Sequence, residues 1–232
     1  MENKNSYIND ILEGIGVIFL YLSLSAFMSY FINLFGISFN NLSNTFKQIY
    51  LIFCECSITI LILYIYKKDF IPNFKDFKSN IKKYIDKYLK YWFMMLCLMI
   101  TSNIIVTLFT TTKVANNQSN IVSLLGKYPV YTAIVTIICA PILEELIFRL
   151  SIRKLFRNDT LFILMSGLIF GSLHVVGNFD KLIDLLFIIP YSIPGFIFAY
   201  VYTKSKNICV PMGIHFIHNT VMILLQLLIT IL

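Results

Sequence analysis

Long apolar stretches alternate with short polar segments along almost the whole chain. Each stretch holds roughly 18 to 26 residues, and about 20 helical residues cross the ~30 Å hydrocarbon core of a bilayer. The pattern therefore predicts an all-α fold: a polytopic transmembrane helical bundle with about seven spans, or eight if an interfacial helix is included. The expected spans are residues 11–36, 48–66, 91–111, 128–148, 160–177, 183–203 and 208–230.

The composition supports a membrane protein. Hydrophobic residues make up 58% of the 232 residues and charged residues only 13%, whereas soluble domains carry about 25% charged residues. A water-soluble core could not absorb this excess, so the soluble classes are excluded. The five cysteines all lie within expected spans, which favours buried apolar packing over disulfides or metal ligation.

The distribution of positive charge indicates how the chain is oriented. The net charge of +7 could suit nucleic acid, but 15 of the 19 lysine and arginine residues fall on one side of the expected topology. Cytoplasmic loops carry such an excess, so this rule places the N-terminus in the cytoplasm and the C-terminus outside the cell (plasma) membrane. We therefore expect a multi-pass protein in contact with the lipid bilayer and no nucleic-acid partner. The sequence leaves its oligomeric state open.

The polar segment at residues 67–90 interleaves eight lysines with aromatic and aliphatic residues. It could lie in the cytoplasmic headgroup layer as an amphipathic helix. It could equally be a solvated basic loop that only fixes the topology. Both interpretations stay open at this point.

Polar residues inside the expected spans gather in the C-terminal half. An ionisable side chain in hydrocarbon is costly, so each one requires an explanation. Glu55 stands apart in the second span, where a contact with a partner inside the bundle is a better explanation than a functional role. The others cluster on three later spans: Glu144, Glu145, Arg149, His174, His215, His218 and Asn219.

Residue counting places two of these side chains at one depth. The fourth and fifth spans should form an antiparallel hairpin that breaks at residues 157–160, with Asp159 as the expected N-cap of the second helix. Glu144 lies fifteen residues before Asp159 and His174 fifteen after it. Both then reach about 20 Å from the turn, provided that the fourth helix continues past Arg149.

Helical phase groups the remaining polar residues. Residues four apart share a helix face, and Glu144 is rotated by about 100° from Glu145, so the two carboxylates can hold different roles. In the last span, His215 and Asn219 lie about 12 and 18 Å from the cytoplasmic end of the helix, near the depth of the hairpin pair. Three pairs are four residues apart: Glu145 and Arg149, Phe170 and His174, and His215 and Asn219.

These pairs fit the patterns EExxxR, FxxxH and HxxxN, in that order along the chain. Together they resemble the CPBP family, also called the Abi or CAAX prenyl-protease type II family of intramembrane endopeptidases. The resemblance covers about residues 125–232, which it implies are the catalytic core helices, whereas residues 1–124 are N-terminal membrane helices that match only as spans. Each motif alone is weak, but three in order at similar depths form a specific signal. The compact chain is similar to bacterial members of the family.

The resemblance implies hydrolysis of a peptide bond in a membrane-associated peptide or protein. A glutamate and a histidine would activate water, and a second histidine with an asparagine would donate hydrogen bonds to the oxyanion of the intermediate. Glu145 and Arg149 of the first motif would form a buried ion pair that fixes the helix. As a less favoured alternative, Arg149 would bind a carboxylate of the substrate. His218 lies outside the pattern and is expected to serve in packing or support. The residues that would carry the reaction are Glu144, His174, His215 and Asn219, and the supporting residues are Glu145, Arg149 and Phe170.

A metal ion is the open question in this chemistry. Glu144, His174 and His215 would match a catalytic zinc site with one open position. The HExxH signature is absent, however, and the family that the chain resembles is described both as metalloprotease and as glutamate-dependent. We therefore expect no metal, with zinc on these three side chains as the alternative.

Two other functions fit parts of the sequence. A catalytically idle membrane protein of the same fold, such as an immunity or scaffold factor, would tend to lose the catalytic positions, which are intact here. A proton-coupled carrier could use the same side chains as a relay, but the two halves show no repeat symmetry. Within the protease interpretation, the roles include peptide maturation, bacteriocin or pheromone processing, self-immunity and CAAX-type processing. Peptide maturation or self-immunity is preferred.

Overall fold

The computed structural model describes residues 4–110, 114–177 and 179–231, and every regular element among them is a helix. Short segments labelled η are 3-10 helices, except η3 and η4, which are π-helical. The elements in chain order are α1 (Lys4–Phe31), η1 (Ile32–Phe35), η2 (Phe39–Asn41), α2 (Asn44–Ile65), α3 (Lys67–Ser79), α4 (Ile81–Phe109), α5 (Asn116–Lys127), α6 (Pro129–Ile134), η3 (Val135–Cys139), α7 (Ala140–Glu145), η4 (Leu146–Ser151), α8 (Ile152–Leu155), α9 (Asp159–Val175), η5 (Leu182–Phe187), α10 (Ile188–Ser205) and α11 (Cys209–Ile231).

Among the residues described, six helical stretches are long and apolar enough to cross a membrane. They are Ser6–Met28, Asn44–Ile65, Ile81–Phe109, Pro129–Leu155, Leu182–Ser205 and Cys209–Ile229. The 17-residue helix α9 is a shorter apolar helix. These seven helices correspond one for one to the predicted spans, so the expected polytopic helical bundle is confirmed.

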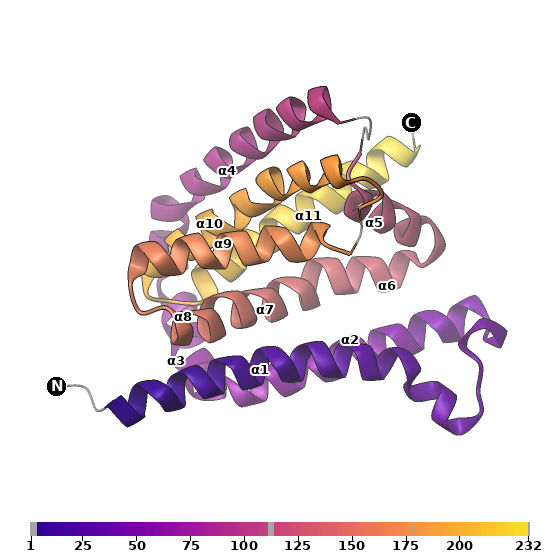
Figure 1. Ribbon diagram of the computed structural model, residues 1–232, viewed down its shortest axis with the longest axis horizontal. Coiled ribbons are helices and arrows are strands. Elements are labelled where there is room, and N and C mark those ends of the chain that lie inside the picture. The colour runs from indigo at the N-terminus through magenta and orange to yellow at the C-terminus, as the bar shows by residue number, and fades with distance from the viewer. Residues whose placement is uncertain (1–3, 111–113, 178, 232) are drawn as a thin grey trace.

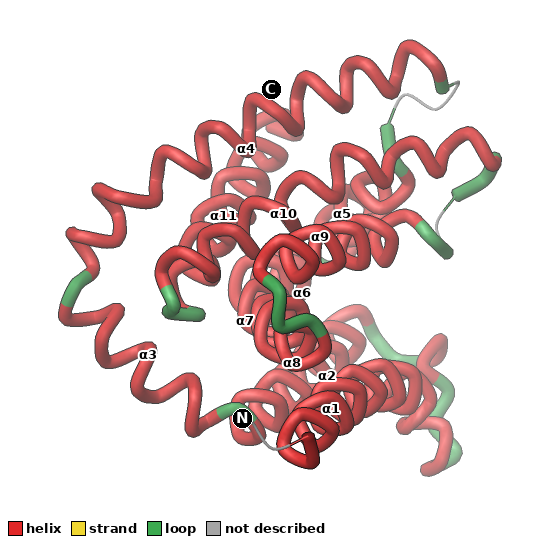
Figure 2. The backbone as a smooth tube through the Cα atoms, turned by 60° about the vertical axis from the view of Figure 1, so that its left-hand side comes forward, coloured by secondary structure: helices red, strands yellow, loops and turns green. Residues whose placement is uncertain are grey.

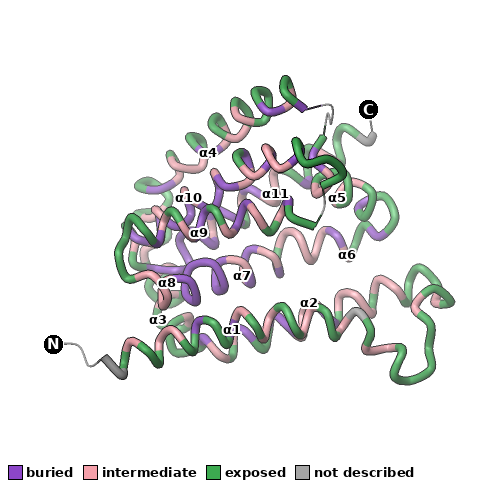
Figure 3. Tube along the Cα trace, in the orientation of Figure 1, coloured by how far each residue is buried: buried purple, intermediate pink, exposed green. Residues whose placement is uncertain are grey.

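The helix that carries the paired glutamates lies in the middle of the bundle (Figure 1). This rod, residues 129–155, runs from α6 through α8, with α1 and α2 on one side and α9, α10 and α11 on the other. Buried residues concentrate on the rod and on α10, whereas α1, α2 and α4 present exposed faces (Figure 3). Many exposed side chains on those faces are large and apolar, such as Phe19, Ile60 and Leu108. Extended apolar surfaces of this kind suit contact with lipid.

The second helix runs parallel to the rod in a constant register. Three of the side-chain contacts between the two elements join partners that are 83 or 85 residues apart. This constancy means that equivalent depths on α2 and on the rod can be read directly from residue numbers. The pairs are Gln48 with Tyr131, Cys56 with Cys139, and Tyr66 with Ser151.

The first helix packs antiparallel against the end of the rod. Gly14 approaches the rod so closely that a Cβ atom there would lie 2.6 Å from the carbonyl oxygen of Ser151. Glu13 forms an ion pair with Lys154, and the Tyr7 hydroxyl donates to the carbonyl of Leu155 at 3.0 Å. The N-terminal helices are therefore attached to the rod and share its core.

Glycines allow the close packing of α9 against α10. A Cβ atom at Gly167 would lie 2.0 Å from the ring of Phe196, and one at Gly195 would lie 2.8 Å from the Cα atom of Gly167. Small residues let helix backbones approach in this way, and in a bilayer close packing is a main source of helix association. The backbone of α9 is thereby fixed next to α10.

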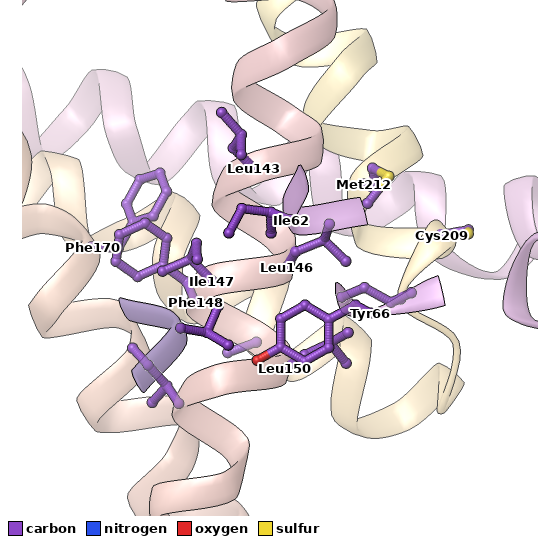
Figure 4. Close-up of a cluster of buried hydrophobic side chains, with 14 of the residues drawn as sticks. Ile62, Tyr66, Leu143, Leu146, Ile147, Phe148, Leu150, Phe170, Cys209 and Met212 are labelled. Carbon is purple, nitrogen blue, oxygen red and sulfur yellow. The ribbon is translucent and has the colours of Figure 1, made fainter. Parts of the chain in front are cut away.

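An apolar cluster surrounds the rod (Figure 4). Ile62 from α2 and Tyr66, which directly follows α2, meet Leu143 and Leu146 from the rod, and all four are nearly or fully buried. Because lipid tails are as apolar as leucine, these contacts stabilise the bundle through van der Waals packing and not through escape from water.

Residues 67–90 form helices, so the solvated-loop alternative is wrong. Helix α3 covers most of the segment and α4 already begins at Ile81, although its span was expected from residue 91. Helix α3 is tied to the α10–α11 turn, where the Asn207 amide donates to the carbonyl of Asn73 at 2.8 Å and to the carboxylate of Asp76 at 2.7 Å. Hydrogen bonds from Tyr84 and Asn207 stabilise the charged carboxylate and lower the pKa of Asp76.

Candidate active site

The hairpin of the rod and α9 has the geometry that residue counting predicted. The rod continues past Arg149 to Leu155, and α9 begins at Asp159. The rings of Phe148 and Phe170, one on each arm, meet with centroids 5.1 Å apart. The two arms therefore pair at equal distances from the turn.

The N-cap of α9 is not the residue we expected. Asn158 caps the helix, because its side-chain oxygen accepts the Leu161 N–H at 3.0 Å. Asp159 is the first helical residue and pairs with Arg153 at 2.6 Å. Asparagine and aspartate cap helices about equally well, so sequence alone could not separate the two neighbours.

Two π-helical segments flank the paired glutamates. Segment η3 ends at Cys139, and η4 follows directly after Glu145. Between them lies α7, a six-residue stretch with Pro141 near its start. Turns of π-helix occur frequently at functional sites, where they change the direction of neighbouring side chains. The two carboxylates thus lie in the one short α-helical stretch between two wider turns.

Glu145 and Arg149 form a completely buried ion pair. The arginine Nε lies 2.9 Å from Glu145 Oε2 and its Nη2 lies 3.2 Å from Oε1, with both side chains 0% exposed. The remaining Nη1 donates to the Ser166 hydroxyl at 2.6 Å, and Ser166 donates in turn to the carbonyl of Phe148 at 2.8 Å. The charged groups therefore have the partners that burial requires.

His215 lies between the two glutamates. Its Nδ1 is 3.1 Å from Glu145 Oε1, and its Nε2 is 3.7 Å from Glu144 Oε2. The imidazole also stacks on the ring of Phe198, with centroids 4.8 Å apart. Glu144 is 20% exposed while Glu145 is fully buried, so the two carboxylates differ in accessibility as well as in direction.

His174 is held by two aromatic rings. Phe170 stacks on it at 4.5 Å and Tyr191 from α10 at 5.4 Å. Its Nδ1 lies 2.8 Å from the carbonyl of Phe170. Because a carbonyl only accepts hydrogen bonds, Nδ1 carries the proton and Nε2 is the basic nitrogen.

A small cavity lies beside His174. Its water-accessible volume is ≈ 10 Å³, which is about the least that one water molecule needs. The walls come from α9, η5 and the start of α5, and Glu144 is not among the lining residues. Within residues 4–110, 114–177 and 179–231, Glu144 lies 3.7 Å from His215, and no hydrogen bond or ring contact joins it to His174.

Asn219 and His218 lie one turn farther along α11. The Asn219 amide donates to the carbonyl of Thr136 in η3 at 2.8 Å, and not to His215. His218 is 8% exposed, and its buried Nδ1 has no hydrogen-bond partner in the described structure. Asn219 therefore ties α11 to the rod in this arrangement.

The side chains of the possible zinc set do not converge. In the described part of the chain, no group of three or more His, Cys, Asp or Glu side chains is placed to hold a metal ion. The Nδ1 atoms of His174 and His215 are engaged with a carbonyl and with Glu145, and only His215 contacts Glu144. The donors thus do not fit a metal in this geometry, and we derive no step through one.

Three residues of the site were missed in the sequence. Ser166 accepts a hydrogen bond from Arg149, Phe198 stacks on His215, and Tyr191 stacks on His174. Their spacing gave no signal, because each contact joins different helices of the bundle. For Ser166, the only indication in the sequence was a hydroxyl group inside an expected span, and Ser172 in the same span carries one as well.

Glu55 has no partner of the expected kind. Its side chain forms no hydrogen bond or ion pair with any residue that the structure describes. The groups within electrostatic reach are the hydroxyls of Tyr21 and Tyr131 and the thiols of Cys54 and Cys139. By the register of α2, Glu55 lies near residues 138–140 of the rod, more than one turn away from Glu144.

Comparisons with known proteins agree with the motifs. The family model for the type II CAAX prenyl endopeptidase Rce1-like proteins matches residues 126–221. YdiL of Bacillus subtilis (strain 168), named as a proposed membrane peptidase, is 38% identical over 97 residues, which cover 40% of this chain and 36% of that protein. The membrane-embedded CAAX protease MroQ of Staphylococcus aureus (strain USA300) is 30% identical over 158 residues, or 63% of this chain and 60% of that protein.

An uncharacterized protein of Mycoplasma capricolum is 27% identical over 215 residues, which cover 84% of this chain and 62% of that protein. This chain therefore spans less than two thirds of the length of each of these relatives. No solved structure matches the chain. The matched region contains all three motifs, and residues 126–221 of this multi-pass membrane protein are similar to the Rce1-like, type II CAAX prenyl endopeptidase family.

Proposed function

We propose that the chain hydrolyses a peptide bond of a membrane-associated peptide or protein with a water molecule activated by Glu144 and His174. The observation that carries this proposal is the position of His215 between the partly exposed Glu144 and the fixed Glu145. An accessible carboxylate beside a buried, fully paired one is the arrangement expected when one acid reacts and the other only orients.

The protons of the site follow from its hydrogen bonds. Glu145 is paired with Arg149 and can only accept, so Nδ1 of His215 carries a proton. In this proposal His215 donates to the oxyanion through Nε2, which requires its doubly protonated form, and the carboxylate of Glu144 accepts the proton of the water.

The remaining two residues complete the mechanism. The Nε2 of His174 accepts a hydrogen bond from the water and orients it. Asn219 uses one amide N–H on Thr136, which leaves its second N–H for the oxyanion. Water adds to the carbonyl, the proton passes to Glu144, and collapse of the intermediate transfers it to the departing amine.

The proposed membrane orientation and biological role rest on the charge pattern and on the similarity of the chain to its relatives. We place the N-terminus in the cytoplasm and the C-terminus outside, because the basic turns lie together at one end of the bundle. Peptide maturation or self-immunity is the preferred role, as the chain resembles compact bacterial members of the family. Processing of a CAAX-type substrate, after the name of MroQ, is the alternative.

The decisive test compares membrane peptides from cells that express the native chain or Glu144→Gln, with new peptide termini mapped by mass spectrometry. Glu13→Gln is the matched control, because it makes the same chemical change at an exposed ion pair outside the site. We expect cleavage products with the native chain and the control and none with Glu144→Gln or His174→Gln. Identical products from all four proteins would refute the mechanism. Stoichiometric zinc in active protein, lost together with activity, would instead support the metal alternative.

A further inference from the structure

The segment between the second and fourth helices is strongly basic. Residues 67–90 contain eight lysines and three aspartates, a net charge of +5 within a chain whose net charge is +7. Helix α3 turns into α4 at an elbow, residues 79–87, which lies on the outer edge of the bundle (Figure 2). The proposed peptidase site uses none of these residues.

The elbow forms an open hollow on the protein surface. Its volume is ≈ 690 Å³. The charged residues that line it are three lysines and one aspartate, and all four are exposed. The lining consists of Ser79, Asn80 and Ile81 together with Lys82, Lys83, Asp86 and Lys87.

The lysines of the hollow have no carboxylate partners. Within the described residues, none of them forms an ion pair. Asp86 lines the hollow with the lysines, and Asp76 lies close enough to Lys83 to be affected by its charge, although its oxygens accept hydrogen bonds from Tyr84, Asn207 and Asn80. With three lysines and one aspartate in its lining, the hollow keeps an excess of positive charge.

The position of the elbow along α4 matches the headgroup layer of a membrane. The apolar part of α4 begins near Tyr91, so Lys87 and Lys82 lie about 6 and 14 Å beyond it along the helix axis. The α10–α11 turn, joined to α3 through Asn207, lies at the same level. Lysine side chains at this depth reach phosphates, which lie just outside the ~30 Å hydrocarbon core.

The surface next to the lysines is apolar. Phe74, Ile81 and Ile85 are between 43% and 49% exposed, although Phe77, three residues after Phe74 on α3, packs into the bundle. An acidic soluble protein would offer no acyl chains to cover these side chains, whereas a lipid offers a phosphate and acyl chains together. The chemistry thus favours a phospholipid.

We propose that the α3–α4 elbow binds the headgroup of an anionic phospholipid, with its phosphate at Lys82, Lys83 and Lys87. This interaction is separate from the peptidase site and holds whether or not the chain cleaves peptides. Each lysine near a charged bilayer surface contributes about fivefold in affinity. Loss of all three is therefore expected to weaken binding on the order of a hundredfold.

The single tryptophan supplies a reporter for the test. Trp92 lies five residues after Lys87 on α4, about 8 Å along the axis. The purified full chain is reconstituted in mixtures of phosphatidylcholine with phosphatidylglycerol that carries brominated acyl chains, and quenching of Trp92 gives the selectivity between the two lipids. We expect a clear preference for phosphatidylglycerol in the native chain. Equal quenching by brominated phosphatidylcholine and phosphatidylglycerol would overturn the proposal.

Three variants test the site itself. K82Q/K83Q/K87Q should lose the selectivity, and K82R/K83R/K87R should keep it because the charge is retained. The matched control K47Q/K127Q/K181Q removes the same charge elsewhere and should also keep it. Selectivity that survives in the first variant, or that falls equally in the control, would contradict the proposal. Inorganic phosphate or glycerol phosphate, added to about 10 mM at constant ionic strength, should not reduce the quenching of Trp92 by phosphatidylglycerol. Displacement of the lipid by either compound would assign the hollow to a free phosphate instead.

Discussion

Replacement of Arg149 by methionine should destabilise the bundle strongly. The change removes a fully buried guanidinium and leaves Glu145 in the interior without its ion pair. Removing one partner of a buried pair costs roughly 3–5 kcal/mol. Because His215 still contacts Glu145 and can take a proton, we expect about 3 kcal/mol, the lower end of this range.

A double-mutant cycle separates the ion pair from simple loss of packing. Glu145→Gln with Arg149→Met removes both charges and keeps similar volumes, and such a replacement is often close to neutral. The free energy of unfolding would be measured in detergent by circular dichroism for the native protein, both single variants and the double variant. We expect the double variant to be more stable than Arg149→Met alone by about 2 kcal/mol. Additive effects, or a loss below about 1 kcal/mol for Arg149→Met, would refute the argument that the buried charges depend on each other.

The remaining predictions concern packing, the second histidine and pH. Gly167→Ala should cost roughly 1–3 kcal/mol of unfolding free energy, because its Cβ would overlap Phe196, whereas Gly16→Ala, with nothing within 4 Å, should be neutral or stabilising; equal thermal shifts would contradict this. Tyr191→Leu should lower the cleavage rate about tenfold by releasing His174, while Tyr191→Phe keeps the ring and most of the rate; equal rates of the two variants would be inconsistent with stacking. Since the folded-state pKa of Asp76 is lowered, its carboxylate stabilises the fold fully above the unfolded pKa of about 3.9, and this effect fades as the pH falls through the folded-state pKa. The melting temperatures of the native chain and Asp76→Asn should therefore converge below about pH 4. A difference in melting temperature that stays constant with pH would contradict this prediction.

Much of the architecture could be read from the sequence, because the bilayer imposes a length and an apolar composition on each span. The depth of Glu144 and His174 could be predicted from counts about the α8–α9 turn, since each helix has a fixed rise per residue. The paired phase of Glu145 and Arg149 followed from helix geometry in the same way. These features depend on one or two helices only.

The details that could not be predicted depend on contacts between distant segments. The hydroxyl of Ser166 at the arginine, the ring of Tyr191 at His174 and the hydrogen bond from Asn219 to Thr136 join elements that no periodicity relates. The π-helical turns around α7 were likewise invisible, because a wider turn leaves the apolar pattern almost unchanged. The helical state of residues 67–90 was left undecided, since lysines alternating with aromatic residues suit a helix at an interface and a solvated loop equally.

The ion pair of Glu145 and Arg149 has a consequence for biogenesis. Its two members are four residues apart on one continuous helix, so they can meet as soon as that helix forms. During insertion, an isolated arginine at the centre of a span costs about 2.5–3.5 kcal/mol on translocon scales. A charge neutralised within its own segment lowers this barrier before α9 or α11 has been synthesised. The rod can therefore insert into the bilayer before the helices that supply the histidines have been synthesised.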